Sequence, residues 1–309
     1  MKRQLARRAD TNLPDGHPSS PRDENGTPRR PGISMADVET LTPPLTDAQW
    51  ADHVTAVVDR IEKAGLAGLT TEVLHTTDSD HRIWSSERSR LHTQIIDEVY
   101  IKTADVPCER LAIMAGGLPG AGKSTVMENH TGIDRPRYLT INPDDFKEDL
   151  ARRGALPDVK GLSPMEASAL AHAESSFLAR VLAVKALADG RNVIWDITMS
   201  SVKTASGRID ELRDAGYRQV DAIFVDLQPE VSVTRADSRH RHGHELFLGR
   251  VGLGGRCLIA DIIRTQTNAE YGSVNRRVFE TLKDRFDNWS VYDNSVDGQP
   301  PRLVDSSEK

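Results

Sequence analysis

The sequence predicts an α/β fold in which a doubly wound parallel sheet carries helices on both faces. Short runs suited to buried strands, such as Leu111–Ala115 and Val220–Leu227, alternate with longer stretches of helical periodicity. This alternation favours parallel strands joined by crossover helices. A glycine-rich turn at 117–124 separates the first of these strands from a helical stretch, which is the context of a phosphate-binding P-loop. We therefore expect a P-loop NTPase/kinase fold with an N-terminal helical addition.

The composition divides the chain into a tail and one domain. Residues 12–30 are built mainly from Pro, Asp, Gly, Ser, Asn and Arg and offer little apolar surface to bury. Residues 1–45 are therefore predicted to be disordered. The remainder, 46–305, is expected to form one P-loop kinase domain, with N-terminal helices at 46–105 and the kinase core at 106–305.

Two helices are expected before the core. The first begins at Thr46 and can end at Gly65, and the second covers Ser86–Tyr100. The apolar residues that recur at helical spacing in the first are Trp50, Val54, Val58 and Ile61. Such spacing places them on one face of a helix, where they would pack against the main domain.

The core continues with further alternating elements. Ser163 and Glu166 form a capping-box pattern that starts a helix, and this helix is expected to run to Asp189 and end at Gly190. A helical stretch ending near Gly216 follows the third strand. The remaining expected strands are Tyr138–Ile141, Asn192–Asp196 and Trp289–Tyr292.

Charge and composition exclude several classes of protein. The 309-residue chain has a formal net charge of −6, which argues against a nucleic-acid binder. It contains no apolar run long enough to cross a bilayer, and the basic start at 1–10 is followed by no apolar stretch, so we expect no secretory signal. Cys108 and Cys257 are far apart and have no CxxC spacing, so we expect no disulfide framework and a cytoplasmic location.

The turn after the first strand matches the P-loop pattern GxxxxGKS/T in full. Its residues are Gly117, Leu118, Pro119, Gly120, Ala121, Gly122, Lys123 and Ser124, followed by Thr125. The glycines allow consecutive backbone N–H groups to point at phosphate oxygens. Lys123 would reach the β- and γ-phosphates, and the Ser124 hydroxyl would be a ligand of Mg²⁺. The motif predicts binding of ATP with Mg²⁺.

Two carboxylates follow the second strand, at the edge where open α/β sheets place their ligands. Asp144 is our candidate for the base that accepts a proton from an attacking hydroxyl, and Asp145 is the alternative. Either residue could instead cap the helix that follows.

Several segments in a fixed order resemble the zeta-toxin family. They are the P-loop, INPDDFK at 141–147, AHAESS at 171–176, NVIWDIT at 192–198 and GLGGR at 252–256. The resemblance extends over roughly residues 80–305. It implies a kinase that phosphorylates the 3′-hydroxyl of UDP-N-acetylglucosamine, and it implies a small helical antitoxin as a partner that blocks the ATP site.

The resemblance also implies roles for single residues. Asp144 falls on the family's catalytic base, with Asn142 where a first Asp is usual. Asp196 and Thr198 fall on the Glu and Thr that face the sugar, and Ile197 replaces a glycine. The shorter Asp side chain reduces the reach toward the amino sugar.

Two arginines that stabilise phosphate charge in the family also have matches. Arg239 matches the first, with Arg235 and Arg241 as rivals, and Arg256 matches the second, in a glycine-hinged lid turn. Phosphoryl transfer requires cations around the moving phosphate. Asn294, after the last strand, either borders the adenine or forms a plain turn.

Other polar residues have simpler interpretations. The histidines of His240–His244 lack zinc-motif spacing, so we interpret that segment as a charged part of the lid. His172 and Glu174 could contact an acceptor, but packing or solvation is favoured.

The favoured function is UDP-N-acetylglucosamine kinase, acting as a toxin on a small-molecule substrate. Three alternatives remain open. They are a polynucleotide 5′-kinase, a P-loop kinase for another small acceptor such as an antibiotic or a nucleotide, and a non-catalytic P-loop protein that binds a partner. The acidic net charge disfavours the first, and the intact Lys123, Ser124 and Asp144 disfavour the last.

Overall fold

The computed structural model describes residues 44–308. Residues 1–43 of the tail that was predicted to be disordered lie outside this described range. The main sheet consists of β1 (Leu111–Gly116), β2 (Leu139–Ile141), β3 (Val193–Asp196), β4 (Gln219–Asp226), β7 (Trp289–Asp293) and β8 (Arg302–Ser306). A separate small hairpin pairs β5 (Thr267–Asn268) with β6 (Gly272–Ser273).

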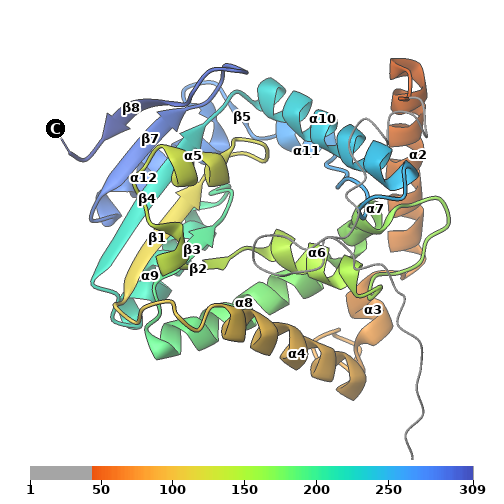
Figure 1. Ribbon diagram of the computed structural model, residues 1–309, viewed down its shortest axis with the longest axis horizontal. Coiled ribbons are helices and arrows are strands. Elements are labelled where there is room, and N and C mark those ends of the chain that lie inside the picture. Colours follow the sequence, from red (N-terminus) through yellow and green to blue (C-terminus); the bar gives the residue numbers. More distant parts are fainter. Residues whose placement is uncertain (1–43, 309) are drawn as a thin grey trace, which may run out of the picture.

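The strand order of the main sheet is β2-β3-β1-β4-β7-β8 (Figure 1). The first five strands run parallel, and β8 pairs antiparallel to β7 at the edge. The crossovers confirm the predicted doubly wound α/β fold. Because β1 lies between β3 and β4, the carboxyl ends of β1, β2 and β3 meet at one edge of the sheet, where a ligand can be reached by all three.

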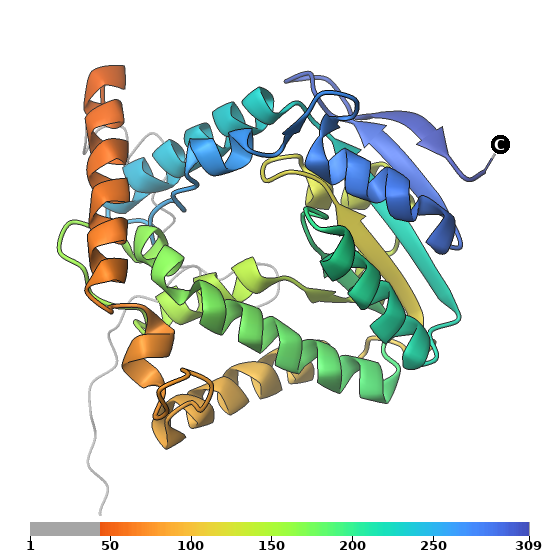
Figure 2. The ribbon, with the colours of Figure 1, turned by 180° about the vertical axis from the view of Figure 1, so that it is seen from behind.

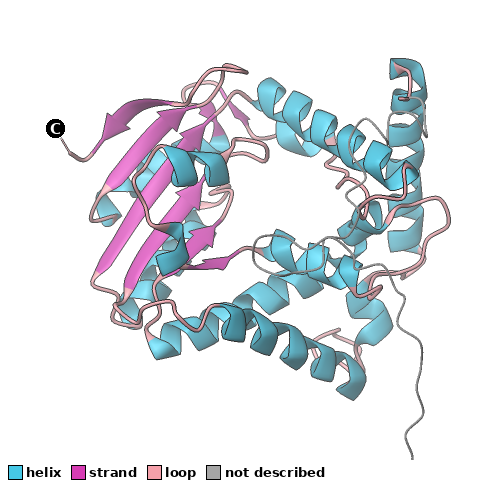
Figure 3. Ribbon diagram, viewed as in Figure 1, coloured by secondary structure: helices cyan, strands magenta, loops and turns pink. Residues whose placement is uncertain are grey.

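Helices cover both faces of the sheet (Figures 2 and 3). Those after the first strand are α5 (Lys123–Asn129), α6 (Pro143–Arg152), α7 (Pro164–Ala167), α8 (His172–Asp189), α9 (Val202–Asp214), α10 (Pro229–Leu248), α11 (Ala260–Arg264) and α12 (Val274–Leu282). One face buries Leu178, Ile209 and Phe279 from α8, α9 and α12 in the same cluster as Met114 of β1. The other face packs Val126 of α5 against the sheet.

The prediction of one continuous helix from Ser163 to Asp189 is wrong. The capping box of Ser163 and Glu166 starts α7 as expected, but a 3-10 turn at Ser168–Ala171 separates α7 from α8. Ser168 Oγ donates to the carbonyl of Met165 at 2.7 Å, and such a side chain competes with the helical hydrogen-bond ladder. The break lets α7 turn away from α8.

The N-terminal helices form the predicted addition. They are α2 (Asp47–Leu66), α3 (Thr71–His75) and α4 (Ser86–Lys102). The first begins with a capping box at Thr46, as the sequence indicates, and ends one residue beyond Gly65. Figure 1 shows α4 alongside α8, whereas α2 stands at the far end of the molecule beside α7 and α10. No helix within residues 44–308 is long and apolar enough to span a membrane.

A buried ion pair fastens α4 to α8. Arg88 donates to both carboxylate oxygens of Glu174, at 2.6 and 2.8 Å, and His92 Nε2 lies 2.6 Å from the same carboxylate. Burial alone would raise the pKa of Glu174, but the bonds from His92 and Arg88 lower it to about 2. Glu174 therefore holds α8 against α4 through these charged contacts, which agrees with the structural role that the sequence favoured.

We expect Glu174→Ala to lower the free energy of unfolding by about 3–5 kcal/mol, because it leaves Arg88 buried without its partner. The stabilisation should be present above the unfolded pKa of about 4.5 and should be lost as the pH falls toward 2. Chemical denaturation between pH 3 and 7 measures both effects. Asp59→Ala, which removes an exposed pair with Lys63, is the control and should cost less than about 1 kcal/mol. Equal losses for the two variants would contradict the interpretation.

Candidate functional site

A cleft of about 1170 Å³ opens at the carboxyl edge of the sheet. Its walls are the P-loop, the start of α6, the loop after β3, one side of α10 and the turn at 252–256. In Figure 1, α6 and α10 lie across from the edge of the sheet where β1 leads into α5. The fold thus brings together segments that are up to 137 positions apart in the chain.

The P-loop has the backbone shape that its sequence predicts. Gly117, Gly120 and Gly122 have φ values of 137°, 76° and 81°, which L-residues with side chains rarely adopt. A Cβ atom on Gly117 would lie 2.4 Å from the carbonyl oxygen of Val225 in β4. Glycine at this position allows the loop to curl tightly against the sheet, with its N–H groups available to phosphate oxygens.

Neighbouring elements fix the outer side of the loop. Leu118 is buried with Ala236 and Ile263, from α10 and α11. Ser232 Oγ donates to the carbonyl of Pro119 at 2.5 Å, and Asn294 Nδ2 donates to the carbonyl of Ala121 at 2.8 Å. Asn294 therefore supports the P-loop backbone. Its predicted position beside an adenine remains a prediction.

The P-loop lysine lies beside an acidic residue of β3. Lys123 Nζ is 3.2 Å from the carbonyl oxygen of Gly117 and 3.4 Å from Asp196 Oδ1. Asp196 Oδ2 accepts a hydrogen bond from Asn142 Nδ2 at 3.3 Å. The sequence placed Asp196 only on the acceptor side, whereas the structure sets it next to the phosphate-binding lysine. Ser124 and Thr125 line the same part of the cleft.

Asp144 does not cap the helix α6. The N-cap of α6 is Asn142, whose side-chain oxygen accepts from the Asp144 N–H at 2.9 Å. The capping alternative for Asp144 and Asp145 is therefore wrong. Asp144 instead forms ion pairs with Arg256 and with Lys147, the latter at 3.3 Å. Burial opposes ionisation, yet these two cations hold the pKa of Asp144 below its usual range.

Asp145 has a different environment from its neighbour. Asp145 is exposed toward the cleft, and protein surrounds its other sides. This partial desolvation, together with the charges of Asp196 and Asp144, raises the pKa of Asp145 to about 6. The two adjacent carboxyl groups therefore differ in charge under mildly acidic conditions. Asp144 is the one that stays ionised and can accept a proton.

The three candidate arginines of α10 have separate surroundings. Arg241 donates to Asp47 of α2 at 2.8 Å, and Arg235 pairs with Asp297 at 2.6 Å. Arg239 lines the cleft together with Arg256. Partial burial, followed by the charge of Arg256, lowers the pKa of Arg239. Of the three, Arg239 is the one among the residues that line the cleft, whereas Arg235 lies at the outer side of the P-loop, 3.5 Å from the carbonyl oxygen of Gly120.

The glycine turn that carries Arg256 is tightly packed. A Cβ atom on Gly254 would lie 2.2 Å from Ser163 Oγ, and one on Gly255 would lie 2.1 Å from the carbonyl oxygen of His240. The turn is therefore held between α7 and α10. This close packing directs Arg256 toward Asp144.

The loop after β3 supplies the remaining predicted residue. Thr198 lines the cleft, and its carbonyl accepts from Asn275 Nδ2 at 2.6 Å. Met199, which follows, is buried with φ of 55°. His172 also lines the cleft. Sequence reasoning did not assign a role to Lys147, although its position three residues after Asp144 on a helix was a signal that the two side chains are neighbours.

The fold and these contacts define a P-loop protein of the kinase-like class. The phosphate-binding loop, an ionised carboxylate and two arginines share one cleft. The family model for zeta toxin matches residues 100–297. The chain belongs to the zeta toxin family.

Solved structures with a similar fold agree with this assignment. The AvrRxo1-ORF1:AvrRxo1-ORF2 complex with sulphate ions is similar over 77% of this chain and 76% of that chain, with 17% identity and a TM-score of 0.59. The AvrRxo1-ORF1:-ORF2 complex with ATP has the same coverage, 18% identity and a TM-score of 0.56. At these identities the likeness shows the shared fold. No match was found among curated proteins.

A third similar structure comes from the PezAT chromosomal toxin–antitoxin system of Streptococcus pneumoniae. It covers 72% of this chain and 82% of that chain at 16% identity, with a TM-score of 0.49. This likeness is too low to support a structural argument.

We expect Arg256→Gln to raise the pKa of Asp144, because the carboxylate would lose its closest cation while its burial remains. The pKa can be measured from the carboxyl carbon shift of labelled aspartate by NMR. Arg235→Gln is the matched control, since Arg235 pairs with Asp297, and it should leave the pKa of Asp144 unchanged. An unchanged titration of Asp144 in Arg256→Gln would show that this ion pair does not govern its charge.

Proposed function

We propose that this protein transfers the γ-phosphoryl group of ATP to a hydroxyl group of a small acceptor, and that the acceptor is the 3′-hydroxyl of UDP-N-acetylglucosamine. The observation that carries the proposal is that Asp144, held ionised by Arg256 and Lys147, shares one cleft with the P-loop. A base on the acceptor side and a phosphate cradle are the two parts that a kinase requires.

The nucleotide side follows from the P-loop. The free backbone N–H groups of the P-loop and the ammonium group of Lys123 would bind the phosphates. Ser124 and Asp196 are the residues that would hold Mg²⁺, since a hydroxyl and a carboxylate are oxygen donors of the kind that this ion prefers. When bound, Mg²⁺ supplies charge neutralisation at the β- and γ-phosphates. The similar AvrRxo1-ORF1:-ORF2 complex was solved with ATP, which supports the choice of nucleotide.

The acceptor side needs a rearrangement of charge. In the absence of ligand, Arg256 and Lys147 neutralise Asp144. A bound triphosphate presents a stronger anion to Arg256, whose move toward it would free Asp144 to orient the hydroxyl group and take its proton. Arg239 would add a second cation to the moving phosphoryl group. Such a change couples nucleotide binding to activation of the base.

Two features support a nucleotide sugar as the acceptor. The cleft of about 1170 Å³ exceeds the range of roughly 300–1,000 Å³ of most single-ligand pockets, so it has room for two ligands. Asp196 and Thr198, which match the sugar-facing residues of the zeta-toxin pattern, border the cleft. Asp196 would then serve both the metal and the acceptor, because it lies between Lys123 and Asn142.

A different small acceptor is the second candidate. The side chain of Ile197 stands where the family has a glycine, and the Asp196 side chain is shorter than the usual Glu, so the sugar pocket differs in shape. ATP consumption with and without UDP-N-acetylglucosamine, followed by product identification, decides between the two. Family membership further supports a small helical antitoxin as a protein partner.

We expect Lys123→Ala to reduce phosphoryl transfer by at least a hundredfold, because the transition state loses a cation worth on the order of 3 kcal/mol. Unchanged far-UV circular dichroism and an unchanged melting temperature would show that the fold is retained. Turnover above half of the wild-type value would refute the assignment of the P-loop as the ATP site.

The sharpest test concerns the proposed base. Asp144→Asn should reduce turnover by a factor of about 100–10,000 and should keep ATP binding and thermal stability, since Asn142 and not Asp144 caps α6. Asp145→Asn is the matched control and should have a milder effect. Measurements of ATP affinity, melting temperature and product formation compare the two variants. If Asp145→Asn were inactive and Asp144→Asn active, the base would be Asp145.

A further inference from the structure

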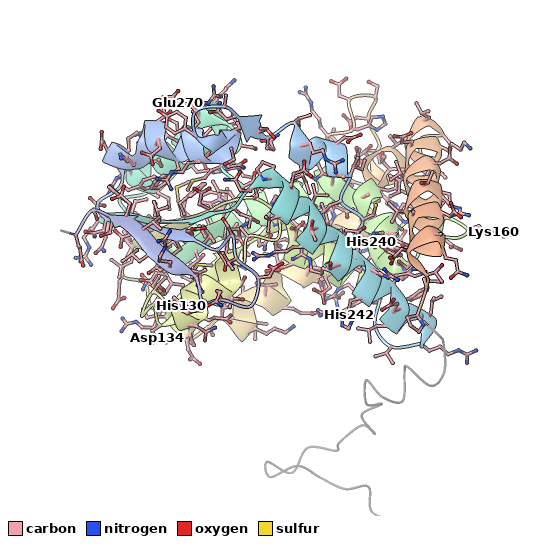
Figure 4. All side chains as sticks on the ribbon, turned by 90° about the horizontal axis from the view of Figure 1, so that it is seen from above. His130, Asp134, Lys160, His240, His242 and Glu270 are labelled. Atoms are coloured by element: carbon pink, nitrogen blue, oxygen red, sulfur yellow. The ribbon has the colours of Figure 1, made fainter. Side chains whose placement is uncertain are left out.

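Three histidines surround a buried carboxylate where α2, α7 and α10 meet. Glu166 Oε1 of α7 lies 2.7 Å from His53 Nε2, 2.9 Å from His240 Nε2 and 3.5 Å from His244 Nδ1. Figure 4 shows His240 on α10 in the region next to α2. His244 is three helical turns beyond Ser232, which contacts the P-loop, so it lies about 18 Å farther along the α10 axis.

The charge of Glu166 is balanced in an unusual way. Its side chain is 0% exposed, and each of its ion-pair partners within residues 44–308 is a histidine. The other buried glutamate, Glu174, has the permanently charged Arg88 against it. No Lys or Arg of residues 44–308 forms an ion pair with Glu166, so it lacks the permanently charged partner that Glu174 has. A bound metal cation would supply that charge.

One nitrogen of the cluster also lacks a partner. His244 Nδ1 is buried and makes no hydrogen bond, although its ring lies close to that of His53, with centroids 3.8 Å apart and the planes tilted by 39°. The side chain of His244 is 10% exposed. Buried polar atoms are normally paired, so an unpaired nitrogen directed at a carboxylate indicates that a ligand belongs between them.

We propose that His53, Glu166 and His244 bind a divalent transition-metal ion of the Zn²⁺ type. One donor atom from each of the three side chains lies within 4.8 Å of the other two. Small side-chain shifts that separate His53 Nε2 from Glu166 Oε1, now 2.7 Å apart, would allow all three to form the roughly 2.0–2.2 Å bonds of zinc. Two imidazole nitrogens favour Zn²⁺ and its neighbours over Mg²⁺ or Ca²⁺, which prefer oxygen donors.

The surroundings suit such an ion. His240 Nε2, 2.9 Å from Glu166, can donate to the carboxylate from outside the ligand set, which orients a metal-binding carboxylate. The Ser163 N–H donates to Glu166 Oε2 at 2.7 Å, so the metal would share Oε1 with the hydrogen bond from His240. Trp50 packs on the rings of His53 and His240, with centroids 5.3 and 4.7 Å away, and covers the cluster with apolar surface.

The ion would have a structural role that extends to the cleft. It would join α2 to α7 and α10, and these last two helices hold the glycine turn of Arg256 through Ser163 and the His240 carbonyl. The proposal differs from the sequence-based interpretation of His240–His244 as a charged lid segment without a metal. Two of the three proposed ligands, His53 and Glu166, come from other helices, so the spacing within 240–244 could not indicate the site.

The test is a titration of the untagged, chelator-treated chain, without nucleotide, with Zn²⁺ by calorimetry and with Co²⁺ by visible absorption. We expect one equivalent to bind, with a rise in melting temperature and a tetrahedral Co²⁺ spectrum. His53→Gln and His244→Gln should each weaken Zn²⁺ binding more than tenfold. His242→Gln, which changes an exposed histidine on the same helix, should leave metal affinity unchanged.

Two outcomes would overturn the proposal. One is the absence of stoichiometric Zn²⁺ binding by the wild-type chain. The other is wild-type affinity in both His53→Gln and His244→Gln, which would place any bound metal elsewhere, such as at a cysteine. Circular dichroism of each variant shows whether it is folded. His53 is the most exposed of the three proposed ligands. His53→Gln preserves the Glu166 carboxylate and its bonds to Ser163 and His240, so this variant still tests the proposal if His244→Gln unfolds.

Discussion

Carboxylates placed away from water require a positive or donating neighbour, and this requirement organises the molecule. Burial without a partner is costly for a charged group. Asp144, Glu166, Glu174 and Asp196 come from different elements, and each is matched by a cation or by imidazoles from another segment. The pairings of Glu166 and Glu174, whose side chains are fully buried, fix how the helices sit around the sheet, because breaking either leaves a buried charge without compensation.

The same constraint distinguishes structural pairs from functional ones. The pair of Arg88 and Glu174 is closed on all sides and fastens α4 to α8. The cations around Asp144 and Asp196 instead face an open cleft, where phosphates can compete for them. Under the proposed function, the internal carboxylates would act as temporary counter-ions that these cations leave when a nucleotide binds.

The helix α10 connects these regions. Near its start Ser232 contacts the P-loop, in its middle Arg239 faces the cleft, and farther on His240 and His244 meet Glu166. Arg241, on another side of the helix, pairs with Asp47 of α2. The N-terminal helical addition therefore contacts the helix that presents Arg239 to the cleft, which links the stability of the addition to the geometry of the cleft.

The sequence by itself determined the parts whose physics is local. The P-loop could be predicted because its glycines, Lys123 and Ser124 all lie within the eight positions 117–124 and determine the backbone shape of that turn. The alternation of strands and helices and the position of Asp144 after β2 followed from periodicity and from a motif in register, whereas the strand order did not. Tertiary structure decided the rest. It selected Arg239 over Arg235 and Arg241, gave the capping role to Asn142, broke the helix after Ala167 and brought His53 to Glu166 across 113 positions. Those outcomes depend on contacts between distant segments, and such contacts exist only once the helices have packed.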